Sequence, residues 1–325
     1  MADRLLEVTD LVTTYSGRSV FRLGEEVRAV DGITLTLDAG EVLAVVGESG
    51  CGKTSTVQTI LRMVDPASGS IRFGGEDITR TSARALRPIR RGMQMIYQDP
   101  YESLDPRFTV RDTMTEPLLV HERGLARAAR EQRIADALET VGLSPAATYL
   151  SRYPHELSGG QRQRVAIAAA LVTRPRLLIA DEPVSMLDVS VRAGILDLLR
   201  SLCAQGLGIV MITHDLATAA RMADRIAVMY LGRIVEEGPA REVIRNPRHP
   251  YTRALLSVVP QRDPLRRVEP QVLTGEPPNA ADIPAGCRFH PRCPLVVDAC
   301  RTTDPALDPV DRAGHQVACI RVHEE

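Results

Sequence analysis

Residues 42–54 read VLAVVGESGCGKT. The five apolar residues at the start form a continuous run, which is typical of a strand buried on both faces of a parallel sheet. Residues 47–54 then fit the pattern G-x-x-x-x-G-K-[ST] in full, and a helix-compatible run, 54–63, follows. In such a loop, backbone N–H groups and the start of a helix converge on phosphate oxygens. The stretch therefore predicts a strand–loop–helix unit that binds the phosphates of a nucleotide.

Two side chains of this loop have expected roles. Lys53, the only lysine in a chain whose other basic residues are all arginine, should reach the β- and γ-phosphates. The hydroxyl of Thr54 should bind Mg²⁺. A glycine-rich turn without a ligand is the alternative, and the joint match of strand, lysine, hydroxyl and helix disfavours it. The predicted nucleotide contacts in the loop are Gly47, Glu48, Ser49, Gly50, Cys51, Gly52, Lys53, Thr54 and Ser55.

Residues 177–183 read LLIADEP and place two acids at the end of a second buried run. Ligands bind at the carboxyl ends of parallel strands in sheets of this kind. We expect Asp181 to hold the Mg²⁺ shell, and Glu182 to act as the base that polarises the attacking water. Taken alone, acidic residues at the end of a strand indicate an ordinary solvent-exposed surface without a functional role. Together with the phosphate loop, it indicates a site that hydrolyses a nucleotide.

The remaining pattern indicates an α/β chain. Residues 209–212 are another short apolar run, and 162–172 have helical periodicity, so strands and helices alternate around a parallel sheet. By contrast, residues 33–37 alternate as an antiparallel strand does. Residues 103–155 look mostly helical, and 229–238 predict a hairpin that turns near Gly232. Composition changes after Gly238. We therefore predict an ATPase domain over 1–238, with a helical subdomain at about 103–170, and a tail domain over 239–325.

Residues 157–161 read LSGGQ at the start of the helical pattern. With this pentapeptide the chain resembles an ABC-type nucleotide-binding domain over about residues 5–260. The other elements of that family follow in order: Gln98 resembles the Q-loop glutamine, 185–188 the D-loop, and His214 the switch histidine. Met186 departs from the usual alanine of the D-loop, which puts contacts across a dimer interface in question.

The resemblance implies a fold and a composite site. The fold would be a RecA-like parallel-sheet core with an antiparallel β subdomain and a helical subdomain. Two such domains would pack head to tail, with ATP between the phosphate loop of one and the LSGGQ of the other. The implied catalytic residues are Glu182, His214 and Gln98, and the implied Mg²⁺ ligands are Thr54, Gln98 and Asp181. Tyr15 would stack on adenine, while Ser158, Gly159, Gly160 and Gln161 would contact the nucleotide of the partner chain.

Three further segments resemble importers of dipeptides, oligopeptides and nickel: residues 98–107, 246–256 and 286–294. The resemblance implies an ATP-hydrolysing subunit that works with a second homologous ATPase chain, two transmembrane permeases and an external substrate-binding protein. Four alternatives remain. They are a soluble ABC ATPase without a membrane partner, an importer ATPase for nickel or another small solute, a regulatory subunit without turnover, and an exporter ATPase.

Composition restricts the partners and the location. The net charge is −1 and aromatic residues make up 3% of 325 residues, so no basic field or stacking platform indicates nucleic acid. The amino-terminal residues resemble neither a signal nor a transit peptide. No apolar run approaches the roughly 20 residues that span a bilayer. We expect a peripheral protein at the cytoplasmic face of the cell membrane.

Four of the six cysteines lie in the tail: Cys287, Cys293, Cys300 and Cys319. Clustered thiols in a reducing compartment indicate metal ligation rather than disulfides. The spacing is wider than in structural zinc sites, and Cys293 precedes a proline as in ferredoxin-type sites. The hypothesis is a [4Fe–4S] cluster, with zinc or free thiols as alternatives. His290 and His315 are possible substitute ligands.

Overall fold

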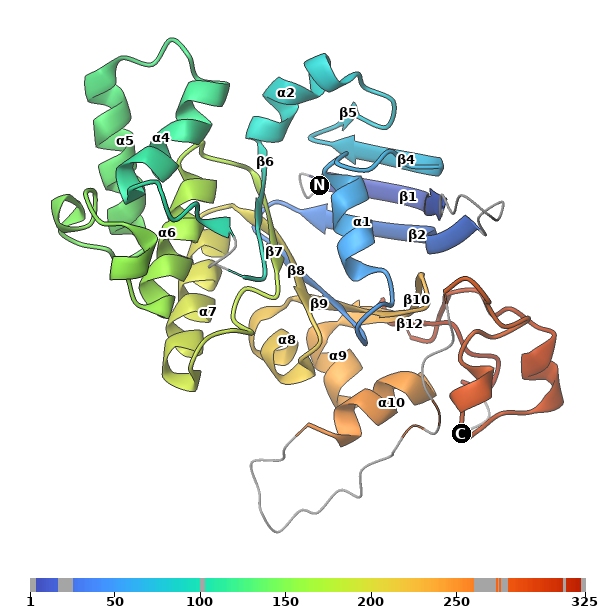
Figure 1. The fold of residues 1–325 in the computed structure, drawn as a ribbon. Coiled ribbons are helices and arrows are strands. Elements are labelled where there is room, and N and C mark those ends of the chain that lie inside the picture. The colour runs from blue at the N-terminus through green and yellow to red at the C-terminus, as the bar shows by residue number, and fades with distance from the viewer. Residues whose placement is uncertain are drawn as a thin grey trace, which may run out of the picture. The chain divides into compact units, whose positions relative to one another are not determined.

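The protein is described by a computed structural model over residues 4–16, 26–99, 103–259, 273, 275, 280–311 and 314–322 (Figure 1). The chain divides into two compact units. The first unit comprises Met1–Leu5, Leu37–Glu41 and Arg80–Met211, and the second comprises Leu6–Thr36, Val42–Thr79 and Ile212–Glu325. Each is described by itself.

An antiparallel sheet in the order β2-β1-β4-β5 lies mostly in the second unit, and only the start of β1 and the end of β2 belong to the first. Its strands are β1 (Arg4–Ser16), β2 (Glu26–Asp38), β4 (Ser68–Phe73) and β5 (Glu76–Asp77). In β2, Ile33 and Leu35 are buried and Thr34 is exposed, because successive side chains of a strand face opposite sides. The predicted antiparallel strand at 33–37 is confirmed.

The second unit also holds the strand that precedes the phosphate loop. Strand β3 (Val42–Val46) is buried along its whole length and pairs in parallel with β9 (Arg225–Tyr230). Helix α1 (Lys53–Ile60) follows the loop, and α8 (Leu216–Met222) packs near β3. The strand–loop–helix unit predicted at 42–63 is therefore present, although the helix ends at Ile60.

The predicted hairpin joins β9 to β10 (Arg233–Pro239) in antiparallel pairing. Leu231 and Gly232 form its turn with φ of 42° and 81°, and positive φ at both positions suits the twist of the two strands. The tail extends this hairpin, since β12 (Gln316–Val317) pairs with β10 and β11 (Asp308–Pro309) pairs with β12. The other tail elements are α9 (Ala240–Arg245), α10 (Pro250–Ser257), η3 (His290–Arg292) and η4 (Asp298–Arg301).

The first unit is mainly helical around a parallel strand pair. Strands β6 (Met93–Ile96) and β7 (Leu177–Asp181) pair in parallel, with Ile96 opposite Ala180. Helices α4 (Val110–His121), α5 (Arg127–Thr140) and α6 (Gly159–Leu171) pack on one another, as the mostly helical pattern of 103–155 predicted. The other elements are α2 (Ala83–Arg91), η1 (Ala146–Thr148), η2 (Pro154–Glu156) and α7 (Val189–Ala204). Strand β8 (Gly208–Thr213) begins in this unit and ends in the second.

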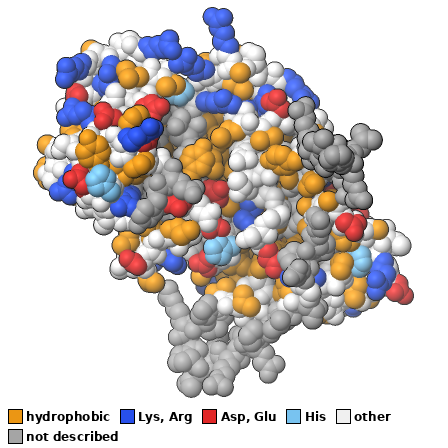
Figure 2. Space-filling model, in the orientation of Figure 1, with side chains coloured by type: hydrophobic (Ala, Val, Ile, Leu, Met, Phe, Trp, Pro, Cys, Tyr) orange, Lys and Arg blue, Asp and Glu red, His pale blue; other side chains and the backbone are white. Residues whose placement is uncertain are grey.

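Arginines of the first unit are interspersed with other side chains. In Figure 2, basic side chains along the upper left edge of the view lie among hydrophobic and acidic ones. Within the described part of the first unit, Arg111 pairs with Glu131, and Arg91 and Arg133 pair with Glu122. Such mixing of charges is typical of a solvated helical surface.

Among the residues that the structure covers, no helix has both the length and the apolar character required to span a membrane.

Candidate nucleotide-binding site

The phosphate loop lies in the second unit, between β3 and α1. Two of its glycines are required by close backbone contacts. A Cβ on Gly52, whose φ is 105°, would lie 2.1 Å from the carbonyl oxygen of Ala29, and one on Gly47 would lie 2.3 Å from that of Met229. Any larger residue would displace the loop, so these positions accept only glycine.

Lys53 is folded back over this loop. It is buried, and its Nζ donates hydrogen bonds to the carbonyl oxygens of Gly47 at 2.8 Å and Glu48 at 2.9 Å. The ammonium is thus held beside the loop backbone, at the first residue of α1. This placement suits a cation that neutralises phosphate oxygens bound by the loop.

Cys51 and Thr54 have different surroundings. Cys51 is buried, and this burial raises the pKa of its thiol even though Lys53 lies nearby. A protonated, buried thiol indicates a packing residue rather than a reactive one. Thr54 is exposed on the first turn of α1, and Ser55 beside it is half-buried.

Two more predicted contacts belong to the second unit. Tyr15 is 39% exposed near the end of β1, as a ring that stacks on a base must be. His214 follows β8 directly and is exposed, and the next residue, Asp215, caps α8 by accepting a hydrogen bond from the Ala217 N–H at 2.9 Å. The histidine therefore stands at a fixed strand end.

The first unit brings the predicted glutamine and glutamate together. Strands β6 and β7 end side by side, which places Gln98 and Glu182 at the same edge. Gln98 Nε2 donates a hydrogen bond to Glu182 Oε2 at 3.0 Å. Asp181, the last residue of β7, is 8% exposed. The carboxyl ends of these parallel strands thus carry an amide and two carboxylates, which is the donor set expected to orient water and Mg²⁺.

Glu182 adopts an unusual backbone conformation, with φ of 46°. A left-handed conformation is uncommon for a glutamate and is found disproportionately at functional sites. It is supported by Ser185, whose N–H and hydroxyl both donate to the carbonyl oxygen of Glu182, at 3.2 Å and 3.1 Å. Ser185 therefore helps to hold the backbone of Glu182 in this conformation.

The LSGGQ segment forms the start of α6, also in the first unit. Ser158 is exposed and caps the helix: its hydroxyl accepts a hydrogen bond from the Gln161 N–H at 3.3 Å, and Gln161 Oε1 accepts one from the Ser158 N–H at 3.0 Å. This capping box fixes the helix N-terminus, where backbone N–H groups and the helix dipole favour an anion. Met186 and Val189 in and beside the D-loop are 59% and 81% exposed.

The four tail cysteines line one small pocket together with His249 and Phe289. The described residues nevertheless contain no group of three or more His, Cys, Asp or Glu side chains arranged to hold a metal ion. His290 Nδ1 lies 2.9 Å from the carbonyl oxygen of Cys287, and the buried His315 bonds Glu236 through Nε2 at 2.7 Å. Neither is among the described residues that line the thiol pocket.

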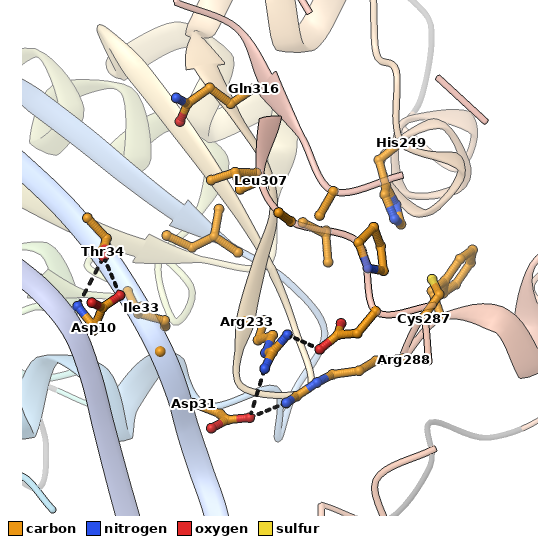
Figure 3. A pocket seen from close by; sticks show the side chains of 18 residues that line it. Asp10, Asp31, Ile33, Thr34, Arg233, His249, Cys287, Arg288, Leu307 and Gln316 are labelled. Atoms are coloured by element: carbon orange, nitrogen blue, oxygen red, sulfur yellow. Dashed lines mark hydrogen bonds and ion pairs between the residues drawn. The ribbon is translucent and has the colours of Figure 1, made fainter. Parts of the chain in front are cut away.

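A larger cavity of about 540 Å³ lies between the tail and strands β1, β2 and β10 (Figure 3). Arg288 pairs with Asp31 on one wall, and Arg233 connects Asp31 with Asp304. Burial acts to raise the pKa of Asp31, but its hydrogen bond to Arg288 and the nearby guanidinium charges outweigh this and lower it. These ion pairs connect the tail to strands β2 and β10.

Two residues that no sequence motif indicated, Tyr251 and Arg292, contact the phosphate loop. Tyr251 Oη accepts a hydrogen bond from the Glu48 N–H at 2.9 Å, and Arg292 binds the Glu48 carboxylate. Both residues lie in segments that carried the resemblance to peptide importers. The pairing of Arg292 with a residue 244 positions away has no signal in a single sequence.

Comparisons with known proteins agree with this geometry. The ABC transporter family profile matches residues 30–185, and the profile of the oligopeptide/dipeptide transporter C-terminal region matches 235–300. A putative peptide import ATP-binding protein of Brucella ovis is 46% identical over 98% of both chains. The oligopeptide transport ATP-binding protein OppF of Salmonella typhimurium is 43% identical over 98% of this chain and 96% of that protein.

Solved structures give the same answer for the fold. The dimeric structure of MJ0796, a bacterial ABC transporter cassette, matches with a TM-score of 0.65 and 28% identity, over 73% of this chain and 99% of that one. The predicted combination of a parallel-sheet core, an antiparallel sheet and helices is confirmed. The chain belongs to the ATP-binding proteins of ABC transporters and, within them, to the peptide-import group.

Proposed function

We propose that this chain binds and hydrolyses ATP to energise an ABC importer of dipeptides or oligopeptides. The observation that carries the proposal is the phosphate loop, in which Lys53 is held over the loop carbonyls at the end of a buried strand. The relatives named as peptide import proteins match both the ATPase region and the tail, and they supply the substrate class.

The residues divide the chemistry between them. Lys53 and the loop N–H groups bind the triphosphate, and Thr54, Asp181 and Gln98 would hold the Mg²⁺ that accompanies ATP. When bound, that ion would supply neutralising charge to the phosphate oxygens. Glu182, oriented by its strained backbone and by Gln98, directs a water molecule at the γ-phosphate. His214 contacts the γ-phosphate, so positioning and charge neutralisation lower the barrier.

The complete site requires a second ATPase chain. Ser158, Gly159, Gly160 and Gln161 contact the nucleotide held by the partner's phosphate loop, and Tyr15 stacks on the adenine of this chain's own ATP. The exposed, capped start of α6 supports this role. Closing around two ATP molecules and reopening after hydrolysis would move the two permeases, with the chain held at the cytoplasmic face of the membrane.

Domain boundaries follow from this assignment. We place the ATPase domain at 1–238, with its helical subdomain at about 103–170, and the tail domain at 239–325. The residues at 100–102 within the importer-like segment 98–107 lie outside the described part of the chain. An importer of nickel or another small solute uses the same ATPase chemistry and differs in its external binding protein.

Co-purification distinguishes transport from a soluble ATPase. The chain is expressed with its candidate partner ATPase and two permeases, then isolated from detergent-solubilised membranes through an affinity tag on this chain. We expect both permeases to remain bound. An ATP-hydrolysing chain that separates cleanly from them would favour the soluble alternative, and one that binds ATP without turnover would favour a regulatory subunit.

We also propose that Cys287, Cys293, Cys300 and Cys319 hold a [4Fe–4S] cluster. The four thiols line one pocket, but they are not arranged there as ligands of a metal ion, so binding of the cluster would have to draw them together. Burial raises the pKa of the Cys287 thiol to about 11, so without a cation in place of its proton it stays neutral and unreactive. Once bound, the cluster would cross-link the tail.

The cluster has a direct test. Protein purified without oxygen should carry iron, sulfide and a broad visible absorbance, and Cys293→Ser should lose most of all three. Cys203→Ser is the matched control, because Cys203 is buried in α7, outside the tail. If the purified protein contains stoichiometric zinc and no iron, the four cysteines form a zinc site and not a cluster. If it contains no metal, the thiols are free.

A further inference from the structure

The phosphate loop is held from outside by a residue of the tail. Arg292 Nη1 donates to Glu48 Oε2 at 2.7 Å, and Nη2 donates to Glu48 Oε1 at 3.1 Å. The Arg292 side chain is 6% exposed and the Glu48 side chain is 28% exposed, so the guanidinium is buried while the carboxylate keeps some contact with solvent. A bidentate guanidinium–carboxylate pair fixes direction as well as distance. Arg292 therefore holds the side chain of Glu48, the second residue of the loop, in one orientation.

A second contact fixes the backbone of the same residue. The hydroxyl of Tyr251, on α10, accepts a hydrogen bond from the Glu48 N–H at 2.9 Å. Tyr251 is fully buried and packs against Tyr230 and Phe289, with ring centroids 4.8 Å and 5.4 Å away. Because this aromatic cluster leaves the Tyr251 ring little freedom, its hydroxyl is a rigid acceptor for the loop.

The tail segment that carries Arg292 is itself anchored at several points. It runs from Cys287 to Cys293, and both thiols line the same pocket. Between them, Arg288 pairs with Asp31, and Phe289 joins the aromatic cluster. The guanidinium of Arg292 is therefore presented to the loop by a segment that cannot easily move.

The charges explain why this contact matters for ATP. A carboxylate within a loop that binds a triphosphate repels the ligand unless a cation neutralises it. Arg292 neutralises Glu48 from the side of the tail, and the same ion pair raises the pKa of Arg292. Lys53 donates to the Glu48 carbonyl oxygen, so a displaced Glu48 would also disturb the lysine.

We propose that Arg292 and Tyr251 are positioning residues of the phosphate loop, so that the cysteine-flanked tail segment sets the affinity for ATP. The proposal rests on the proposed binding of ATP by Lys53 and the loop. It assigns to the tail a role in the nucleotide site of its own chain, through Glu48.

The test measures ATP dissociation constants for the full-length chain at a temperature where every variant is folded. Arg292→Gln should weaken ATP binding about tenfold, the scale of losing one hydrogen bond to a charged group. Arg292→Lys keeps the positive charge but not the bidentate geometry of the guanidinium, so it should lose less affinity for ATP than Arg292→Gln. Arg301→Ala is the matched control, because Arg301 is a tail arginine whose side chain is 60% exposed, and it should bind ATP as the parent does.

A double substitution shows whether the effect passes through Glu48. On a Glu48→Gln background, Arg292→Gln should change the dissociation constant by less than about twofold, since the pair is already broken. In the assembled ATPase, Arg292→Gln should raise KM for ATP and leave kcat nearly unchanged. A merely structural role would lower Tm and leave both the dissociation constant and KM unaltered, which would overturn the proposal.

Tyr251→Phe provides a second test of the proposal if Arg292→Gln does not fold. It keeps the ring in the aromatic cluster and removes only the acceptor of the Glu48 N–H, so ATP binding should weaken about threefold, as for one neutral hydrogen bond. Parental affinity in this variant would contradict the proposal. A parent chain that fails to bind ATP would instead contradict the proposed function itself, and the two failures are therefore distinguishable.

Discussion

Glu182→Gln should bind ATP with the affinity of the parent chain and hydrolyse it at least about 100-fold more slowly, the loss expected when a general base is removed. The amide keeps the size and planarity of the carboxylate, so the contact with Gln98 at 3.0 Å can be retained. It cannot accept a proton from water, however, and the attacking water loses its polarising group. Phosphate release from the assembled transporter measures the rate, and equilibrium binding of labelled ATP measures the affinity.

Glu139→Gln is the matched control for this substitution. Glu139 is an exposed residue of α5 in the same unit, and its change to glutamine should leave turnover at the parental rate. If Glu182→Gln turns over ATP at a near-parental rate, Glu182 is not the base, and another group must direct the water.

Lys53→Ala should abolish detectable ATP binding, with affinity falling on the order of 100-fold, because a charge-assisted contact with the phosphates is lost. The structure adds a second reason. The Lys53 ammonium also holds the carbonyl oxygens of Gly47 and Glu48, so its removal loosens the loop as well as removing a charge. Titration of the purified chain with a fluorescent ATP analogue measures the loss.

The control for the lysine lies on the next turn of the same helix. Gln58→Ala changes a half-buried residue of α1 beyond the loop and should retain ATP affinity. Parental affinity in Lys53→Ala would mean that the loop binds phosphates through backbone N–H groups alone. Lys53→Arg should not restore binding, because the larger guanidinium does not fit where Lys53 is buried.

Much of the nucleotide site could be predicted from local sequence. The continuous apolar runs identified β3 and β7, because a strand buried on both faces has no polar alternation. The loop glycines, the LSGGQ helix start and the turn near Gly232 each depend on neighbouring residues only. Local chemistry therefore sufficed to place Lys53, Glu182 and Ser158 on the correct elements.

What the sequence could not provide are the contacts between distant segments. The pairs Glu48–Arg292 and Asp31–Arg288 join residues 244 and 257 positions apart. Nothing in the composition around Arg292 distinguishes it from the other arginines of the tail. The convergence of the four cysteines could be suggested by their number, but which of them share a pocket depends on how the tail folds.

The central claim is that this chain releases phosphate from ATP in order to move peptides. The most direct measurement is phosphate release by the reconstituted importer in liposomes, with the binding protein and a dipeptide or oligopeptide added outside. We predict hydrolysis that requires Mg²⁺, rises when peptide-loaded binding protein is added, and disappears with Glu182→Gln in this chain. Hydrolysis that is equally fast with and without peptide, or with and without Glu182, would contradict the account.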